Sequence, residues 1–152
     1  MLNTFIDGVL KRGGKTVFLV GPSGSGKTKF LLNLSQKETL PYISLNVELS
    51  KKINELTIGD KDWEIFLSNV INAQTGDIIL LDNTELLFTR DLSINPIRLL
   101  KSQNRRKVII MVWNGEYNGT TLTYGNPGDE DYRKFSSNDL DGIEIIKMSD
   151  LR

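Results

Sequence analysis

The apolar residues of this chain switch repeatedly between two spacings, one typical of helices and one typical of buried strands. Near the N-terminus the helical spacing i, i+3, i+4, i+7, i+8 is filled by Leu2, Phe5, Ile6, Val9 and Leu10. This spacing predicts an amphipathic N-terminal helix within residues 1–14, which a pair of glycines ends. Similar spacing and helix-start signals predict three further helices, beginning near Lys27, Trp63 and Pro96.

Short, continuous apolar runs predict the strands. Such runs are typical of parallel strands that are covered on both faces. They occupy residues 16–20, 42–47, 77–82, 108–113 and 143–147. Because these strands alternate with helices, we expect an α/β fold with a mainly parallel sheet, helices on both faces and a ligand site at the carboxyl ends of the strands. The length of 152 residues predicts a single domain over residues 1–152.

The last third of the chain departs from this alternation. Asn118-Gly119 predicts a type I′ turn, so that residues 115–128 would form a β-hairpin extension of the fourth strand. Beyond it, the acidic residues 129–131 indicate the start of a short helical piece that carries Tyr132, Arg133 and Phe135. Residues 48–60 are mixed and polar, and they predict no element.

Composition removes several kinds of chemistry. The sequence contains no cysteine and no histidine, which excludes disulfides, Cys- or His-bound metals and Ser-His-Asp catalysis. A metal would be bound by oxygen ligands, and Mg²⁺ suits that. The formal net charge is +0, so no global field attracts nucleic acid or an acidic membrane. No apolar run approaches the roughly 20 residues of a membrane span, and the first residues do not resemble a signal peptide, so we expect a cytoplasmic protein with no membrane association.

Residues 21–28 carry the strongest candidate chemistry. They match the pattern G-x-x-x-x-G-K-[ST], between a predicted strand and a predicted helix, which is typical of a phosphate-binding loop. In this pattern backbone N–H groups surround the phosphates, Lys27 reaches the β- and γ-phosphates and the Thr28 hydroxyl is a ligand of Mg²⁺. We expect ATP and Mg²⁺ as cofactors, and adenine is preferred because no guanine-recognition motif is visible. The residues expected to bind the nucleotide are Gly21, Pro22, Ser23, Gly24, Ser25, Gly26, Lys27, Thr28 and Lys29.

Candidates for the second half of the site follow two other strands. Asp82 has the form of a Walker-B aspartate, a second Mg²⁺ ligand, although it could instead cap the following turn. Asn83 stands where many ATPases of this architecture have a catalytic glutamate. Glu85 could activate water in its place, or stand exposed at the start of a short helix. Asn114 ends the fourth predicted strand, where it could contact the γ-phosphate or the attacking water, or only form a turn with the next glycine.

An arginine could complete the stabilisation of the transition state. Arg133 is the first candidate, because it lies between the fourth strand and the last. The alternatives are Arg90, Arg98, Arg105 and Arg106. An arginine supplied in trans would require a partner or self-association of this chain. The basic residues 105–107 are also a hypothetical DNA contact.

Several segments together resemble the BrxF family, small P-loop proteins encoded with one type of BREX (bacteriophage exclusion) defence system. The likeness covers nearly the full chain. Countless NTPases share the phosphate-loop pattern, so the other segments are the ones that distinguish this family. The segments are residues 21–28 and 78–88, Trp113-Asn114-Gly115, and residues 122–133 with Leu122-Thr123-Tyr124, Pro127-Gly128 and Tyr132-Arg133. The resemblance implies a three-layer P-loop NTPase fold of the ASCE or AAA-like kind, with five strands in the order 5-1-4-3-2 and no C-terminal helical lid. It also implies partners from the defence system, including a large ATPase and a DNA methyltransferase, and a mainly indirect contact with DNA.

Three functions are compatible with these residues. The first is a Mg²⁺-dependent ATP-binding and ATP-hydrolysing regulatory subunit of an anti-phage complex of the BREX type, with Lys27, Thr28 and Asp82 at the centre and Glu85 and Asn114 assisting. The second is a nucleotide-binding switch or scaffold without turnover, which the asparagine after the Walker-B aspartate favours. The third is a small-molecule or nucleoside kinase, although no arginine-rich lid segment is visible between the strands.

Overall fold

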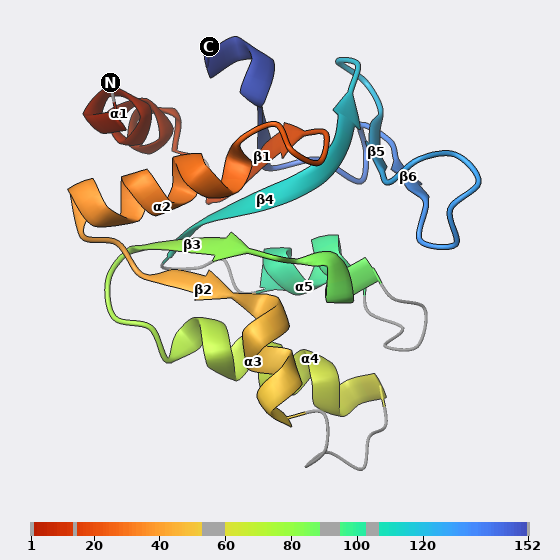
Figure 1. Ribbon diagram of the computed structural model, residues 1–152, viewed down its shortest axis with the longest axis horizontal. Helices are drawn as coiled ribbons and strands as arrows, with labels where there is room; N and C mark the ends of the chain where they lie inside the picture. The colour runs from red at the N-terminus through yellow and green to blue at the C-terminus, as the bar shows by residue number, and fades with distance from the viewer. Residues whose placement is uncertain (1, 14, 53–59, 89–94, 103–106, 152) are drawn as a thin grey trace.

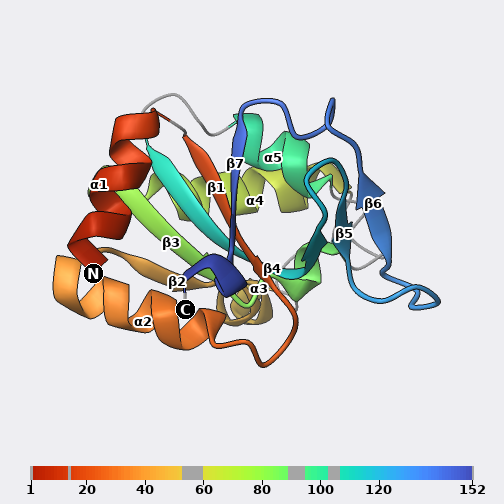
Figure 2. The same ribbon diagram turned by 90° about the horizontal axis from the view of Figure 1, so that it is seen from above.

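A mainly parallel sheet with helices on both faces forms the body of the molecule (Figures 1 and 2). The computed structural model describes residues 2–13, 15–52, 60–88, 95–102 and 107–151. The strands are β1 (Thr16–Gly21), β2 (Tyr42–Ser44), β3 (Ile78–Asp82), β4 (Val108–Tyr117), β5 (Leu122–Tyr124), β6 (Arg133–Phe135) and β7 (Ile143–Lys147). The predicted α/β class and mainly parallel sheet are therefore confirmed.

The sheet contains seven strands, five in its parallel part and two in an antiparallel extension. Its parallel part has the order β2-β3-β4-β1-β7, and every neighbouring pair in it is parallel. The other two strands lie beyond the body of the sheet, where β5 pairs antiparallel with the outer part of β4 and β6 pairs antiparallel with β5. In Figure 1 this three-stranded ribbon extends away from the parallel strands.

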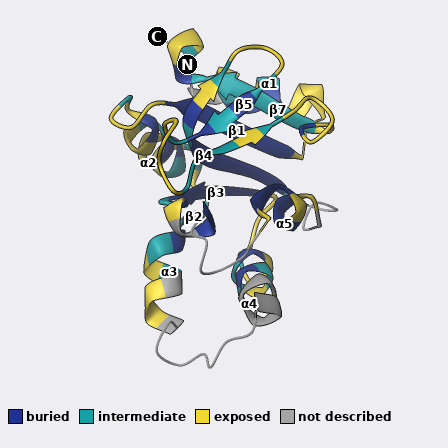
Figure 3. Ribbon diagram, turned by 90° about the vertical axis from the view of Figure 1, so that its right-hand side faces the viewer, coloured by how far each residue is buried: buried dark blue, intermediate teal, exposed yellow. Residues whose placement is uncertain are grey.

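The alternation of side chains along the strands builds two separate cores. On one face, α1 (Leu2–Arg12) and α2 (Lys27–Glu38) pack against residues such as Val17 and Leu19. On the other face, α3 (Leu45–Lys52), α4 (Asp60–Asn72), α5 (Pro96–Ser102) and η1 (Glu85–Phe88) pack against Phe18 and Val20. Figure 3 shows β3 and β4 buried between these two layers. No helix in the described ranges is long and apolar enough to span a bilayer.

Local start and stop signals account for several helix ends. Gly13, with φ 72°, follows the end of α1, as the glycine pair predicted. The predicted cap of α5 is also confirmed, since Asn95 Oδ1 accepts the N–H of Arg98 at 3.1 Å. Gly76 has a φ of 102° and lies four residues beyond the end of α4, in the loop before β3.

Several predictions of local structure are wrong. Residues 48–52 belong to α3, although no element was predicted for residues 48–60. The second strand ends at Ser44, not at residue 47, because its partner strand ends at Asp82, directly opposite, and the chain turns into α3. Residues 133–135 form β6 instead of a helical piece, since pairing with β5 places Phe135 against the aromatic core. The hairpin of β4 and β5 exists, but its loop has four residues, 118–121, and of the two turn residues only Gly119 has a positive φ, so it is not a type I′ turn.

The C-terminal part of the described chain returns to the body of the sheet. β7 pairs with β1, and the short helix η3 (Met148–Leu151) follows it. Met148 is buried there and lies against the loop that joins β1 to α2. The end of the described chain thus supports the loop that carries the strongest sequence motif.

Candidate functional site

The loop between β1 and α2 borders a cavity of about 410 Å³ at the carboxyl edge of the parallel sheet. One wall consists of loop residues and the first turn of α2, from Ser23 to Lys29. The other wall comes from the end of β3, from η1 and from the middle of β4, with Asp82, Asn83, Glu85 and Asn114. The fold therefore brings together residues from three segments that are far apart in the sequence.

The backbone of the loop needs its glycines. Gly24 and Gly26 have φ values of 82° and 93°, a left-handed conformation that side chains disfavour. A Cβ on Gly21 would lie 2.6 Å from the Ser25 hydroxyl oxygen and 3.3 Å from Met148. Gly26 is also the N-cap residue of α2 and has no side chain that could cap the helix. The first N–H groups of α2 thus remain able to bind an anion, to which the helix dipole adds.

Lys27 places a buried cation against this loop. It is only 4% exposed, and its Nζ donates to the carbonyl oxygens of Gly21 at 2.7 Å and Pro22 at 2.6 Å and to Ser25 Oγ at 3.2 Å. Burial lowers the pKa of the Lys27 ammonium, and the negative charges of Asp82 and Glu85 oppose that effect. A buried ammonium with only neutral acceptors is a favourable partner for an anionic oxygen.

Asp82 is held on both of its oxygens. Its side chain is buried, Oδ1 accepts the backbone N–H of Asn83 at 2.8 Å and Oδ2 accepts the hydroxyl of Tyr42 at 2.6 Å. Burial raises the pKa of Tyr42, with a further contribution from the hydrogen bond and charge of Asp82, so the phenol stays protonated and remains a donor at neutral pH. The backbone contact of Asp82 is with the adjacent Asn83, whereas a capping aspartate accepts an N–H two or three residues further on, and the Asp82 side chain also lines the cavity.

Glu85 is exposed and begins the short helix η1, as the alternative predicted, but it also lines the cavity and contacts two asparagines. Asn46, at the start of α3, donates from Nδ2 to Glu85 Oε2 at 3.1 Å, and Asn114 donates from Nδ2 to Oε1 at 3.3 Å. The neighbouring Thr84 anchors this segment, because its hydroxyl donates to the carbonyl of Val112 at 3.1 Å. Asn114 lies inside β4, which continues to Tyr117, so the alternative of a turn-forming asparagine is wrong.

The two arginine candidates that the structure describes lie outside the cavity wall. Arg133, on β6, donates from Nη2 to the carbonyl of Phe88 at 3.0 Å, and its guanidinium carbon lies 5.5 Å from the centre of the Phe88 ring. Arg98 is exposed on α5. Within the described ranges no arginine lines the cavity. Arg90, Arg105 and Arg106 lie outside the described residues.

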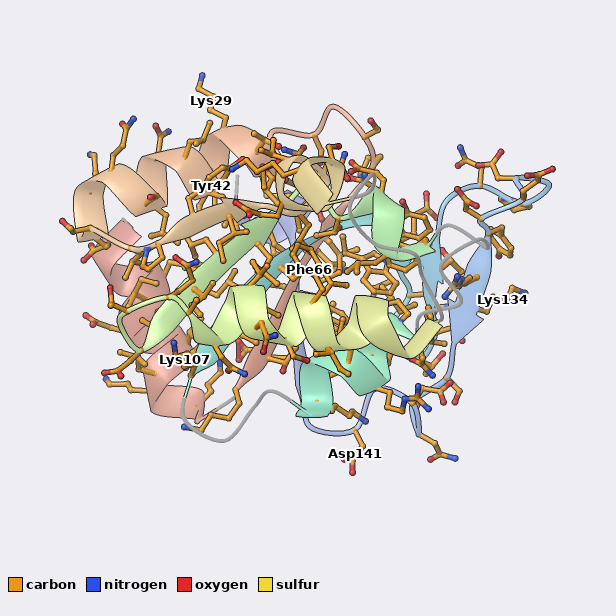
Figure 4. All side chains as sticks on the ribbon, turned by 90° about the horizontal axis from the view of Figure 1, so that it is seen from below. Lys29, Tyr42, Phe66, Lys107, Lys134 and Asp141 are labelled. Carbon is orange, nitrogen blue, oxygen red and sulfur yellow. The ribbon has the colours of Figure 1, made fainter. Side chains whose placement is uncertain are left out.

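The oxygen atoms that line the cavity fit a metal whose remaining ligands come from phosphate and water. Thr28 and Asp82 both line it, while the part of the chain that the structure describes holds no group of three or more acidic residues that could bind a metal alone. Mg²⁺ commonly binds through one or two protein oxygens together with phosphate oxygens and water. The residues present therefore fit a magnesium nucleotide better than a free ion. Thr28 and Lys29 are exposed, and Figure 4 shows the Lys29 side chain extending outward from α2.

Two residues of the site do not belong to any motif. Tyr42 contacts the carboxylate of Asp82, and Asn46 contacts that of Glu85. In the sequence, however, Tyr42 is only an aromatic residue of a predicted strand and Asn46 only a polar residue near its end. The weak signal available was the parallel pairing of β2 with β3, which places Tyr42 two residues before the partner of Asp82. Predicting these contacts required the register of the strands.

Comparison with known proteins adds little to this geometry. No protein-family model matches the chain, and no curated protein matches it either. Among solved structures, that of C. elegans PCH-2 matches with a TM-score of 0.40 and 16% sequence identity, over 88% of this chain and 35% of the other. This chain thus spans about a third of that structure's length. A likeness at this TM-score carries no argument about function, which has to come from the site itself.

Proposed function

We propose that this chain binds Mg²⁺ and ATP at the loop of residues 21–28 and hydrolyses the ATP. The observation that carries the proposal is the convergence on one cavity of a buried lysine, the uncapped N-terminus of α2 and a buried carboxylate. Each of these features is costly or unsatisfied alone, and a triphosphate with its metal satisfies all three. The absence of a guanine-recognition motif in the sequence supports ATP over GTP.

Each residue has a role in this proposal. The N–H groups of the loop and of the first turn of α2 bind phosphate oxygens, and the Lys27 ammonium neutralises their charge. Thr28 and Asp82 would hold Mg²⁺, and the chemistry that this ion supplies is the neutralisation of charge on the phosphates. Glu85, held by Asn46 and Asn114, orients the attacking water and accepts its proton.

A second candidate function is a nucleotide-binding switch without turnover. Two observations favour it: Asn83 occupies the position after the buried aspartate, and no arginine in the described ranges lines the cavity. An arginine in this role is worth about 10³ to 10⁵ in rate where it is used. Turnover by the isolated chain would therefore be slow, and a partner or a second copy of the chain would have to supply the arginine.

The biological setting in this proposal rests on the resemblance to the BrxF family. On that basis the chain is a regulatory subunit of a bacterial defence complex of the BREX type. Its partners would be a large ATPase and a DNA methyltransferase, and contact with DNA would be indirect. These partners would respond to changes in the loops that line the cavity when nucleotide binds.

Binding of ATP in the presence of Mg²⁺, measured by calorimetry, tests the core of the proposal. Lys27→Ala removes the buried ammonium, so we expect ATP affinity to fall at least tenfold, the effect of about 1.4 kcal/mol. Lys37→Ala is the matched control, because Lys37 is an exposed lysine in the last turn of the same helix. Wild-type protein that takes up no nucleotide, or a Lys27→Ala variant with unchanged affinity, would contradict the proposal.

Phosphate release separates the two candidate functions. Steady release by the wild-type chain that is lost in Asp82→Ala supports hydrolysis. Tight binding with no release, both alone and with DNA and the proposed partner proteins added, supports the switch. The same assay with GTP in place of ATP tests the base preference.

A further inference from the structure

The hydrogen bond from Tyr42 to Asp82 belongs to no sequence motif, and it is shorter than the bond from Asn46 to Glu85. The hydroxyl of Tyr42 lies 2.6 Å from Asp82 Oδ2 and is partly buried with it. The two residues come from neighbouring parallel strands, β2 and β3. The Tyr42 ring packs against the apolar core on the side of α1 and α2, and Figure 4 labels it beneath α2.

The bond leaves Asp82 free to bind a further partner. A carboxylate has about four lone-pair positions on its two oxygens. One on each oxygen is used in the structure, by the hydroxyl of Tyr42 and by the N–H of Asn83. Since the side chain also lines the cavity, its remaining lone pairs are available there. A donor on each oxygen fixes the rotation of the carboxylate.

We propose that Tyr42 is a positioning residue for the metal-binding carboxylate, and that its hydroxyl holds Asp82 in the orientation that receives Mg²⁺. This inference rests on the proposed function, in which Asp82 is the magnesium ligand. Groups that hydrogen-bond to metal ligands commonly change metal affinity by about 10- to 100-fold when they are removed. Tyr42 touches neither phosphate nor water in this proposal, and it acts only through Asp82.

The chain offers a conservative variant and a matched control. Tyr42→Phe removes the hydroxyl but keeps the ring that packs against the core. Tyr117→Phe removes a hydroxyl of the same kind, which donates to the carbonyl of Gly119 at 2.8 Å within the hairpin. The two variants thus differ in whether the lost hydroxyl contacts Asp82.

The test measures ATP affinity by calorimetry at a series of Mg²⁺ concentrations and in EDTA. For Tyr42→Phe we expect the Mg²⁺ concentration of half-maximal effect to rise about tenfold, while ATP affinity in EDTA stays as in wild type. Tyr117→Phe is expected to match wild type in both. Because each variant is compared with itself with and without Mg²⁺, a loss of stability does not imitate this result. Electron paramagnetic resonance with Mn²⁺ as the probe gives a second readout, in which the nucleotide-bound Mn²⁺ signal saturates at a higher concentration in Tyr42→Phe.

The outcomes distinguish this inference from the function on which it rests. Wild-type protein that binds no ATP overturns both. Wild-type protein whose ATP affinity depends on Mg²⁺, together with a Tyr42→Phe variant of identical Mg²⁺ dependence, overturns the inference and leaves the proposed function standing. A Tyr42→Phe variant that loses ATP affinity equally in EDTA and in Mg²⁺ also overturns it, because the effect is then not on the metal.

Discussion

Asn83 is a structural residue of the site. Its φ of 50° lies in the left-handed region, which asparagine tolerates better than most side chains. Its side-chain amide donates to Ser44 Oγ at 2.8 Å, and its carbonyl accepts the N–H of Asn46 at 3.1 Å. Asn83 therefore joins the end of β3 to the junction of β2 and α3. These contacts explain why an asparagine suits this position, although many ATPases have glutamate after a Walker-B aspartate.

Glutamate at this position is expected to damage the fold without creating a catalyst. Asn83→Glu places a longer side chain in the left-handed region and loses the bond to Ser44, so we expect a loss of about 1–2 kcal/mol in unfolding free energy. Phosphate release should not rise, because the backbone here points the side chain at Ser44. Urea unfolding and a steady-state phosphate assay measure the two effects. A stable Asn83→Glu variant with faster turnover would contradict this interpretation, and Asn83→Gly, which relieves the backbone strain, is the control.

At the scale of elements, a buried tryptophan contacts both the ribbon of β4, β5 and β6 and the core of the body. Trp113 is fully buried, stacks on Phe18 with ring centres 4.7 Å apart and meets Phe88 edge to face at 5.0 Å. Its indole N–H donates to the carbonyl of Thr123, in β5, at 2.9 Å. Gly115 lies two residues further along β4, opposite Tyr124, where the strands approach closely. The pairing of β4 with β5 therefore requires glycine at position 115.

A methyl group at Gly115 is expected to separate β4 from β5. A Cβ there would lie 1.8 Å from the carbonyl oxygen of Thr123, so the backbone of the partner strand would have to move. We expect Gly115→Ala to cost about 1–3 kcal/mol and to shift the Trp113 fluorescence to the red, measured in a Trp63→Phe background. Gly8→Ala is the control, because a Cβ there meets only the flexible end of Arg12, and it should be neutral or stabilise α1 by up to about 1 kcal/mol. Equal stability of the two variants would argue against the close approach.

The elements were predictable where their signals are local, and not where they depend on pairing. Apolar runs and caps, such as Asn95 before α5, identify strands and helices within a few residues. The end of β2, the turn of the hairpin and the strand β6 depend on which residues lie opposite, and single-strand patterns do not contain that information. The candidate residues of the loop 21–28 and Asp82 could be identified from sequence patterns for the same local reason, whereas the contacts of Tyr42 and Asn46 needed the register of the strands.

At the scale of the whole molecule, the pH dependence of stability depends on which ionisable groups are buried. An ion pair of Arg12 with Glu144 links α1 to β7, and the hydrogen bond to Glu144 raises the pKa of Arg12. Because Arg12 is largely exposed, we assign this pair little weight in stability. Two tyrosines matter more, since burial raises the pKa of both the partly buried Tyr42 and the buried Tyr124. They make the fold sensitive to alkaline conditions.

Tyr124, which is not among the residues that line the cavity, allows this sensitivity to be tested. Burial raises its pKa to about 12, from an ordinary value of 10.0, and the charges of Glu85 and Asp131 contribute in the same direction. Below pH 10 both the folded and the unfolded chain keep this proton. Between pH 10 and 12 the unfolded chain releases it and the folded chain does not, so stability falls as the pH rises, by up to about 1.4 kcal/mol per pH unit.

Tyr124→Phe removes this one contribution and keeps the ring that stacks on Phe88. We expect the difference in unfolding free energy between the variant and wild type to be constant from pH 8 to about 10, and to grow in favour of the variant above that by roughly 1 kcal/mol per unit. Urea unfolding at half-unit steps of pH measures both curves, and Tyr42, present in both proteins, cancels in the difference. Parallel curves up to pH 11.5 would show that the hydroxyl of Tyr124 ionises as readily in the folded chain as in the unfolded one. The packing of Tyr124 against Phe88 and Trp113 would then leave its hydroxyl open to solvent.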